Sequence, residues 1–119
     1  MSLLTDTQRA RLLANGRTNA TRSAAGQAEQ DFVPVVKLFT PEAGATWLLT
    51  ELDPGDEDAA FGLCDLGLGC PELGYVSLTE LTIVRGRLGL PVERDCHFEG
   101  DKPLSAYAIE AHTAGRIKA

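Results

Sequence analysis

Several features are missing from this sequence of 119 residues, and each absence excludes a class of protein. No apolar run approaches the ~20 residues that a membrane-spanning helix requires. Residues 1–6 lack the basic segment and the apolar segment of a secretory signal, so we expect a cytoplasmic protein without a membrane anchor. The cysteines number three, an odd count that argues against a disulfide framework and fits a reducing compartment.

Basic residues are missing from the middle of the chain. Residues 38–80 contain no lysine and no arginine, although the protein has 11 of them. The acidic residues in the same stretch are Glu42, Glu51, Asp53, Asp56, Glu57, Asp58, Asp65, Glu72 and Glu80. The net charge of −6 therefore comes from an acidic middle between two mildly basic flanks. A surface of one sign attracts basic proteins and repels nucleic acid, which argues against direct nucleic-acid binding.

The acidic middle also carries the strongest structural signal. Apolar runs rich in strand-forming residues occupy residues 46–53, 59–66 and 73–78. An acidic turn at 53–58 and a glycine-rich bend at 67–71 separate these runs. Short apolar runs bounded by Pro, Gly and Asp are typical of antiparallel strands joined by tight turns. We therefore predict a meander that forms the centre of the fold.

Two further strands are predicted on either side of the meander. Residues 32–39 are apolar and rich in β-branched side chains, and Pro34 belongs at the start of that strand or on a sheet edge. Residues 92–98 alternate in polarity with the period of a strand. The face expected to be buried consists of Val92, Arg94, Cys96 and Phe98.

Helices are predicted from capping patterns and periodicity. A capping box at residues 5–8 begins a helix over 6–15, which Gly16 is expected to end. A second box at 77–80 begins a short helix that continues to about residue 84. Apolar side chains recur at helical spacing in residues 104–111, and Gly115 is expected to close that helix.

Residues 17–31 are predicted to form a flexible linker. They contain no aromatic and no branched aliphatic side chain, so little apolar burial could offset the entropy of ordering them. A loosely held helix over residues 24–30 is the second interpretation. The complete prediction is one α+β domain, with an N-terminal helix in residues 1–16 and a sheet core plus C-terminal helix in 32–119. Its mostly antiparallel sheet has about five strands.

Four blocks of sequence together resemble a known family. They are Val35–Pro41, Thr46–Pro54, Phe61–Gly67 and Pro71–Leu78. In this order they resemble the bacterial family called domain of unknown function 2958, and the likeness extends over nearly the whole chain. The resemblance implies a protein encoded on plasmids and other mobile genetic elements, with no assigned biochemical activity. It also implies that residues 18–30 are an insertion relative to shorter members.

Metal and cysteine chemistry are not favoured by the spacing of the side chains. The candidate zinc ligands are Cys64, Cys70, Cys96 and His97. The gap between Cys64 and Cys70 is too long for the usual pair of zinc ligands, and adjacent strand residues point to opposite faces. A catalytic Cys–His pair oriented by Asp65 or Asp95 would need an activated thiol, for which the local sequence gives no signal. We predict no metal, no cofactor and no catalytic residues, with Cys64 and Cys96 in the core.

Other binding patterns are also incomplete. The acidic turn at 53–58 lacks the glycine and glutamate offsets of a calcium-binding EF-hand. The glycines of residues 62–74 are followed by no Lys-Ser/Thr of a phosphate-binding loop. Trp47, Phe61 and Tyr75 lie on successive predicted strands, and we expect them to meet across the sheet as part of the core.

Two functions remain in competition. The favoured one is a small, acidic, non-enzymatic accessory protein of a mobile genetic element that binds a protein partner with a basic surface. Its sharpest form is counter-defence, in which the acidic surface occupies the basic nucleic-acid groove of a host nuclease or CRISPR-type complex. The predicted partner-binding residues are Glu51, Asp53, Asp56, Glu57, Asp58, Asp65 and Glu72. We expect that the three acids of residues 56–58 can be reversed together without unfolding the protein.

The alternative is a small enzyme or a small-ligand-binding module. Its site would lie near Asp65, Glu72, Tyr75 and His97. A simpler possibility is that the acidic loops only keep a small domain soluble.

Overall fold

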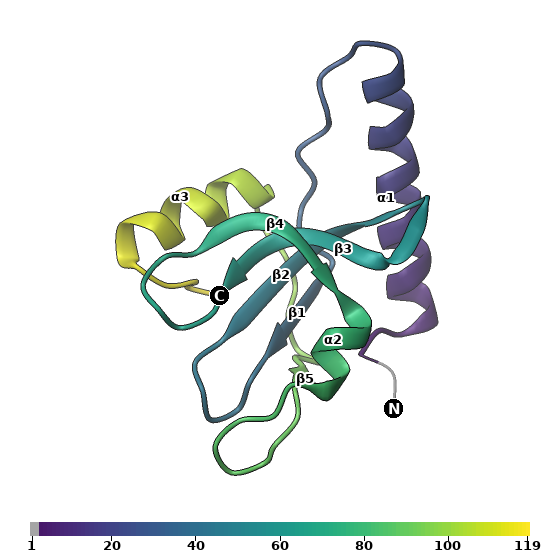
Figure 1. The fold of residues 1–119 in the computed structure, drawn as a ribbon. Coiled ribbons are helices and arrows are strands. Elements are labelled where there is room, and N and C mark those ends of the chain that lie inside the picture. The colour runs from purple at the N-terminus through teal and green to yellow at the C-terminus, as the bar shows by residue number, and fades with distance from the viewer. Residues whose placement is uncertain (1–2) are drawn as a thin grey trace.

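The computed structural model describes residues 3–119 as three helices and five strands (Figure 1). The helices are α1 (Asp6–Ala24), α2 (Leu78–Ile83) and α3 (Leu104–Ala114). The strands are β1 (Val36–Phe39), β2 (Thr46–Asp53), β3 (Asp56–Asp65), β4 (Glu72–Ser77) and β5 (Glu93–Arg94). None of the helices in this part of the chain combines the length and apolar character needed to cross a bilayer.

All the strands belong to one antiparallel sheet. Their order is β4-β3-β2-β1-β5, so β4 and β5 are the two edges and β2 is the central strand. Helices α1 and α2 pack on one face of this sheet, and α3 packs on the other. The predicted α+β class with an antiparallel sheet of five strands is therefore confirmed.

Strands β2, β3 and β4 form the meander that the turn residues of the sequence predict. The tight turn between β2 and β3 is held by Asp53, whose Oδ1 accepts a hydrogen bond from the Gly55 N–H at 2.8 Å. The β2–β3 register shifts twice, between Asp53 and Leu52 beside the turn and at a bulge between Glu51 and Leu49. Such a bulge changes which face the following residues occupy.

Strand β2 is buried on both faces. Trp47, Leu49 and Leu52 pack in the core under α1 and α2, whereas Leu48 packs in the core under α3. Trp47 is only 3% exposed. The expectation that Trp47 meets Phe61 and Tyr75 is wrong, because those two rings lie on the α3 face, where their centroids are 5.1 Å apart.

Helix α1 starts as predicted but ends elsewhere. The Thr5 hydroxyl and the Gln8 side chain make both hydrogen bonds of the capping box, each at 3.0 Å. Gly16 does not end the helix. It lies where α1 crosses β2, and a Cβ at this position would be only 1.7 Å from the Leu52 carbonyl oxygen. The helix continues to Ala24, so the prediction of a linker is wrong for residues 17–24.

Residues 25–31 return alongside the end of α1 (Figure 1). They form neither the predicted alternative helix over 24–30 nor a strand. The Asn19 side chain holds them, because its Nδ2 donates to the Gln30 carbonyl at 3.1 Å and its Oδ1 accepts from the Gln30 N–H at 2.7 Å. Arg22 adds a bond from its Nε to the Ala28 carbonyl at 2.7 Å. The second half of α1 and this returning segment therefore form one unit.

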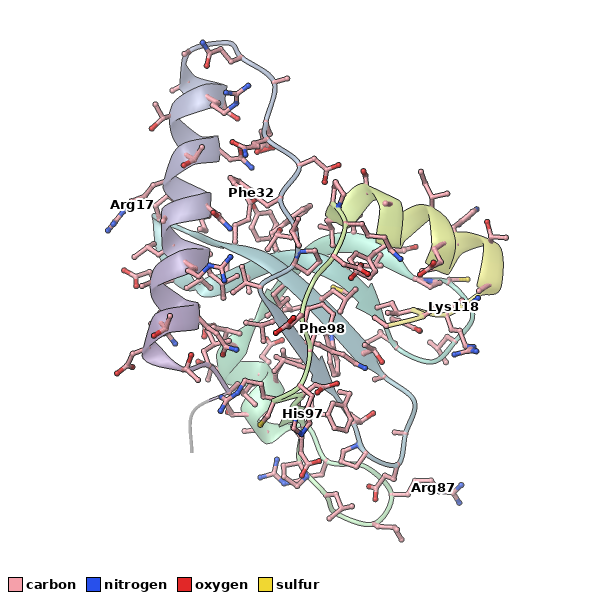
Figure 2. All side chains as sticks on the ribbon, turned by 180° about the vertical axis from the view of Figure 1, so that it is seen from behind. Arg17, Phe32, Arg87, His97, Phe98 and Lys118 are labelled. Atoms are coloured by element: carbon pink, nitrogen blue, oxygen red, sulfur yellow. The ribbon has the colours of Figure 1, made fainter. Side chains whose placement is uncertain are left out.

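The last predicted strand is much shorter than expected. Only Glu93 and Arg94 pair with β1, and the chain then turns where Asp95 Oδ1 accepts a hydrogen bond from the His97 N–H at 2.9 Å. From His97 the chain crosses the sheet through Phe98 to reach α3 (Figure 2). Phe98 consequently packs in the α3 core, and Cys96 is exposed, so the predicted common buried face is wrong.

Replacing Trp47 with alanine should destabilise the fold by roughly 3–5 kcal/mol, as is usual for a large buried side chain. Urea unfolding followed by circular dichroism measures the change. Leu88→Ala is the matched control, because Leu88 is 80% exposed and its loss should leave the midpoint nearly unchanged. Equal midpoints for Trp47→Ala and the wild type would show that the Trp47 ring is not part of the core.

Candidate functional site

The predicted partner-binding acids differ sharply in exposure. Asp56, Glu57 and Glu72 are exposed, Asp53 and Asp58 are half-buried, and Glu51 and Asp65 are buried. The exposed pair Asp56 and Glu57 begins β3 at the tip of the β2–β3 hairpin, whereas Glu72 begins the edge strand β4. The acids therefore do not form one surface, and the buried ones need a separate account.

Asp65 has a structural role. It is 2% exposed, and its carboxylate accepts hydrogen bonds from the backbone N–H groups of Gly67 at 2.8 Å and Ile117 at 2.9 Å. These bonds fix the bend after β3 and bring the buried Ile117 side chain into the α3 core. A carboxylate used in this way is not available to a partner.

Asp58 is also used within the fold. Its carboxylate accepts hydrogen bonds from the Ser77 hydroxyl at 2.5 Å and from the Thr79 N–H and hydroxyl at 2.8 and 2.7 Å. These bonds, the Ser77 bond first, lower the pKa of Asp58. Because Ser77 is the N-cap of α2, Asp58 attaches that helix to β3. Reversing Asp58 together with its neighbours would therefore disturb the fold, contrary to the sequence-based expectation.

A small hollow of about 210 Å³ lies beside the β2–β3 hairpin. Its walls come from the second half of α1, the residues that follow α1, the hairpin and β4. The side chains that give it chemical character are Asn19, Glu29, Glu51, Asp53 and Tyr75. Among the described residues that line it there is no lysine and no arginine.

Glu51 is the buried acid of this hollow. It is 8% exposed, and its Oε2 accepts a hydrogen bond from Asn19 Nδ2 at 2.9 Å. Within residues 3–119 its Oε1 has no hydrogen-bond partner. Burial raises the pKa of Glu51, the Asn19 bond opposes that rise, and the nearby charge of Glu29 adds to it. The hollow therefore contains a carboxylate that would be stabilised by a cation.

Tyr75 forms the aromatic wall of the hollow. It is 59% exposed and leans on Phe61, its direct partner on β3. Burial raises the pKa of the Tyr75 phenol, and the charges of Glu51, Asp53 and Glu29 raise it further. The phenol therefore stays protonated at neutral pH. An aromatic face beside carboxylates is an arrangement that favours ammonium or guanidinium groups.

The alternative site near Asp65, Glu72, Tyr75 and His97 is not assembled. Tyr75 lies in the edge strand β4, whereas His97 follows β5 at the opposite edge of the sheet (Figure 2). Asp65 is buried and bonded to the backbone. These residues therefore do not converge on one ligand.

The cysteines differ in exposure and in the pKa of the thiol. Cys64 is half-buried and Cys70 is exposed. Burial raises the pKa of the Cys64 thiol to about 11, with a further contribution from Glu72, so this thiol is protonated at neutral pH and a poor nucleophile. Between Leu3 and Ala119, no group of three or more His, Cys, Asp or Glu side chains is placed to hold a metal ion.

Two residues of the hollow were not identified from the sequence. Asn19 and Glu29 lie in the stretch predicted as a linker. Glu29 belongs to no recognisable motif, and Asn19 begins the glycosylation triplet Asn19-Ala20-Thr21, which gives no sign of this contact. The only sign of a binding role in the sequence is an acid and an amide within a polar segment, and such residues are common in solvent-exposed loops. Their roles depend on the length of α1 and on the return of the chain beside it.

Glu51→Gln should change how stability depends on pH. The pKa of Glu51 is raised by folding, so its contribution to stability is complete below its ordinary value of 4.5 and is lost as the pH rises through the folded pKa. The amide of glutamine can still accept from Asn19 but carries no charge. Compared with the wild type, Glu51→Gln should therefore gain stability between about pH 4.5 and about pH 8.

Urea unfolding at those two pH values measures this gain, and the exposed-site variant Glu57→Gln controls for the loss of one charge. A stability difference between Glu51→Gln and the wild type that does not change with pH would contradict the raised pKa.

Thiol labelling should separate the cysteines. At about pH 7.5, iodoacetamide should modify Cys70 and Cys96 quickly and Cys64 at least about tenfold more slowly, because the Cys64 thiolate is scarce and half-buried. Peptide mass spectrometry at successive times gives the rates. In urea the difference should disappear. Labelling of Cys64 first in the folded protein would contradict its raised pKa.

Comparison with known proteins gives one match. No curated protein and no solved structure matches the chain. The model of a family described as "Protein of unknown function (DUF2958)" matches residues 3–118. That match extends over nearly the whole sequence and confirms the resemblance seen in its four blocks. The chain therefore belongs to the DUF2958 family of proteins of unknown function.

Proposed function

We propose that this protein is a small, non-enzymatic accessory protein that binds a protein partner with a basic surface. It acts in the bacterial cytoplasm, as the product of a plasmid or another mobile genetic element. The partner contacts the hairpin tip at Asp56 and Glu57 and the neighbouring hollow with Glu51 and Asp53. Asp58 and Asp65 are held within the fold, at α2 and at the bend after β3, and do not touch the partner.

One observation carries the proposal: within the described part of the chain, no acid of residues 38–80 belongs to an ion pair. The two ion pairs within the described part of the chain are Lys37–Asp95 at 3.4 Å and Lys102–Glu110 at 3.2 Å. Neither involves an acid of that stretch. Even Arg17, on the helix that packs beside the hairpin, extends away from the sheet (Figure 2). Carboxylates without ion-pair partners attract a basic partner and accelerate its association.

Counter-defence is the sharpest form of this function. A host nuclease or CRISPR-type complex binds nucleic acid in a groove lined with lysine and arginine, because phosphate contacts provide much of the affinity. A compact protein with exposed carboxylates on a hairpin can occupy such a groove in place of phosphates. A mobile genetic element would benefit from a protein that blocks host defence in this way.

Reversing the hairpin charges should weaken partner binding and leave the fold intact. The double variant Asp56→Lys/Glu57→Lys changes two exposed residues and spares Asp58. Tagged protein captures partners from a bacterial host lysate at about 50 mM and about 500 mM salt. The wild type should retain a basic partner at the lower salt concentration only, and the variant should recover about tenfold less of it.

The matched control is Glu93→Lys/Glu99→Lys, which changes two exposed acids outside the acidic stretch by the same charge. It should capture as much partner as the wild type. Equal loss in both double variants would show that only net charge matters. Capture of no partner at either salt concentration, together with a small metabolite that raises the melting temperature, would reject the proposed function.

A further inference from the structure

The outer edge of β4 is open. β4 pairs only with β3, and that pairing runs without a register shift from Ala59–Ser77 to Cys64–Glu72. Within the described chain, no backbone group of residues 73–76 hydrogen bonds outside this pairing. The strand contains no proline and no lysine, two residue types that commonly protect an edge from further pairing. The edge can therefore accept another strand.

The side chains along this edge form a two-part surface. Leu73 and Tyr75 are 50% and 59% exposed and lie on the same face of β4, two residues apart. Tyr75 borders the acidic hollow. Leu73 borders a second, mainly apolar hollow of about 530 Å³ between β4 and α3, where Ile109 is 71% exposed. One end of the edge is therefore acidic and aromatic, and the other end is mainly apolar, although Glu72 and His112 also line it.

The acidic end suits a basic side chain. Glu51 lies there with its Oε2 bonded to Asn19 and its Oε1 accessible from the hollow, and Glu29 and Asp53 add further charge. A guanidinium can bond to a carboxylate and stack on an aromatic ring at the same time. The exposed ring of Tyr75 provides that second contact.

We infer that the open edge of β4 binds an extended segment of the partner as an added strand, with an arginine side chain in the hollow beside Glu51 and Tyr75. An apolar side chain two residues away lies over Leu73 and Ile109. The spacing along the strand fits, because residues i and i+2 of a strand share a face and are ~6.6 Å apart. Across the sheet the arginine extends over Tyr75 toward Glu51, which lies on β2. Because the partner is itself proposed, this assignment rests on the proposed function and specifies the segment that is recognised.

Charge selects this occupant over a second copy of the chain. Another copy at the same edge would bring a second set of acids toward the first, and like charges across neighbouring strands are destabilising. A basic extended segment instead places a positive charge beside the carboxylates of Glu29, Glu51 and Asp53. Main-chain hydrogen bonds to β4 would provide affinity, and the two hollows would provide specificity.

Synthetic peptides test the inference on the purified full chain. The probe is a fluorescein-labelled peptide with alternating threonine and larger residues, Thr-Val-Thr-Arg-Thr-Val-Thr, and fluorescence anisotropy measures its binding. Replacing its arginine with citrulline, which has the same shape without charge, should weaken binding at least about tenfold. N-methylation of its backbone should do the same, because it removes the donors of an added strand.

Variants of the protein locate the binding site. Glu51→Gln and Tyr75→Ala should each weaken binding of the arginine peptide about tenfold, whereas Glu99→Gln and Leu88→Ala, at exposed positions elsewhere, should bind as the wild type does. Fluorescence of Trp47, the single tryptophan of the chain, verifies that each variant is folded. Slower hydrogen exchange of the β4 amides on peptide binding is the expected sign of an added strand.

Four outcomes would overturn the inference. Equal binding of the arginine and citrulline peptides would exclude a cation in the hollow, and binding insensitive to N-methylation would exclude an added strand. A concentration-dependent dimer that excludes the peptide would assign the edge to a second copy. If the peptide fails while capture from lysate still depends on Asp56 and Glu57, the added strand is rejected and the proposed function stands.

Discussion

The burial of β2 on both faces is the constraint on which this fold depends. Residues 47–52 are all buried, so each face of the strand must be covered along its length. Helices α1 and α2 cover one face and α3 covers the other. Strands buried on both sides have near-continuous apolar runs, which is what Trp47-Leu48-Leu49 shows. The exposed side chains therefore lie at the hairpin tip, at the edges of the sheet, in the loops and on the outer faces of the helices.

The meander could be predicted from the sequence because neighbouring residues determine its strands and turns. Turn residues such as Asp53 and Gly55 separate apolar runs, and each strand forms between two such turns. The second half of α1 could not be predicted, because distant contacts stabilise it. Asn15 Nδ2 donates to the Thr50 carbonyl at 2.9 Å, and Asn19 bonds to Glu51. Composition indicates how much apolar area a segment can bury. It does not indicate whether the polar side chains of that segment form hydrogen bonds with residues about thirty positions away.

The acids of the candidate site could also be predicted only in part from the sequence. The sequence identified the acidic stretch but could not separate acids held within the fold, such as Asp58 and Asp65, from those that face outward. It also missed Glu29, which reaches the hollow only because Asn19 holds Gln30. Charge per residue is a property of sequence, whereas the availability of a carboxylate is a property of its neighbours.

Gly16 has a consequence for how the acidic hollow responds to a ligand. Close approach of α1 to β2 depends on a residue that weakens helices, in a helix that also contains several threonines and asparagines of modest propensity. The order of α1 thus depends on its contacts with the sheet, and Asn19, which lines the hollow, lies in its second half. Local opening of that half would dismantle the hollow without melting the sheet. A ligand that binds only the intact hollow would stabilise the ordered second half of α1 by mass action. The fraction of protein with bound ligand and the fraction with an ordered α1 would therefore rise together.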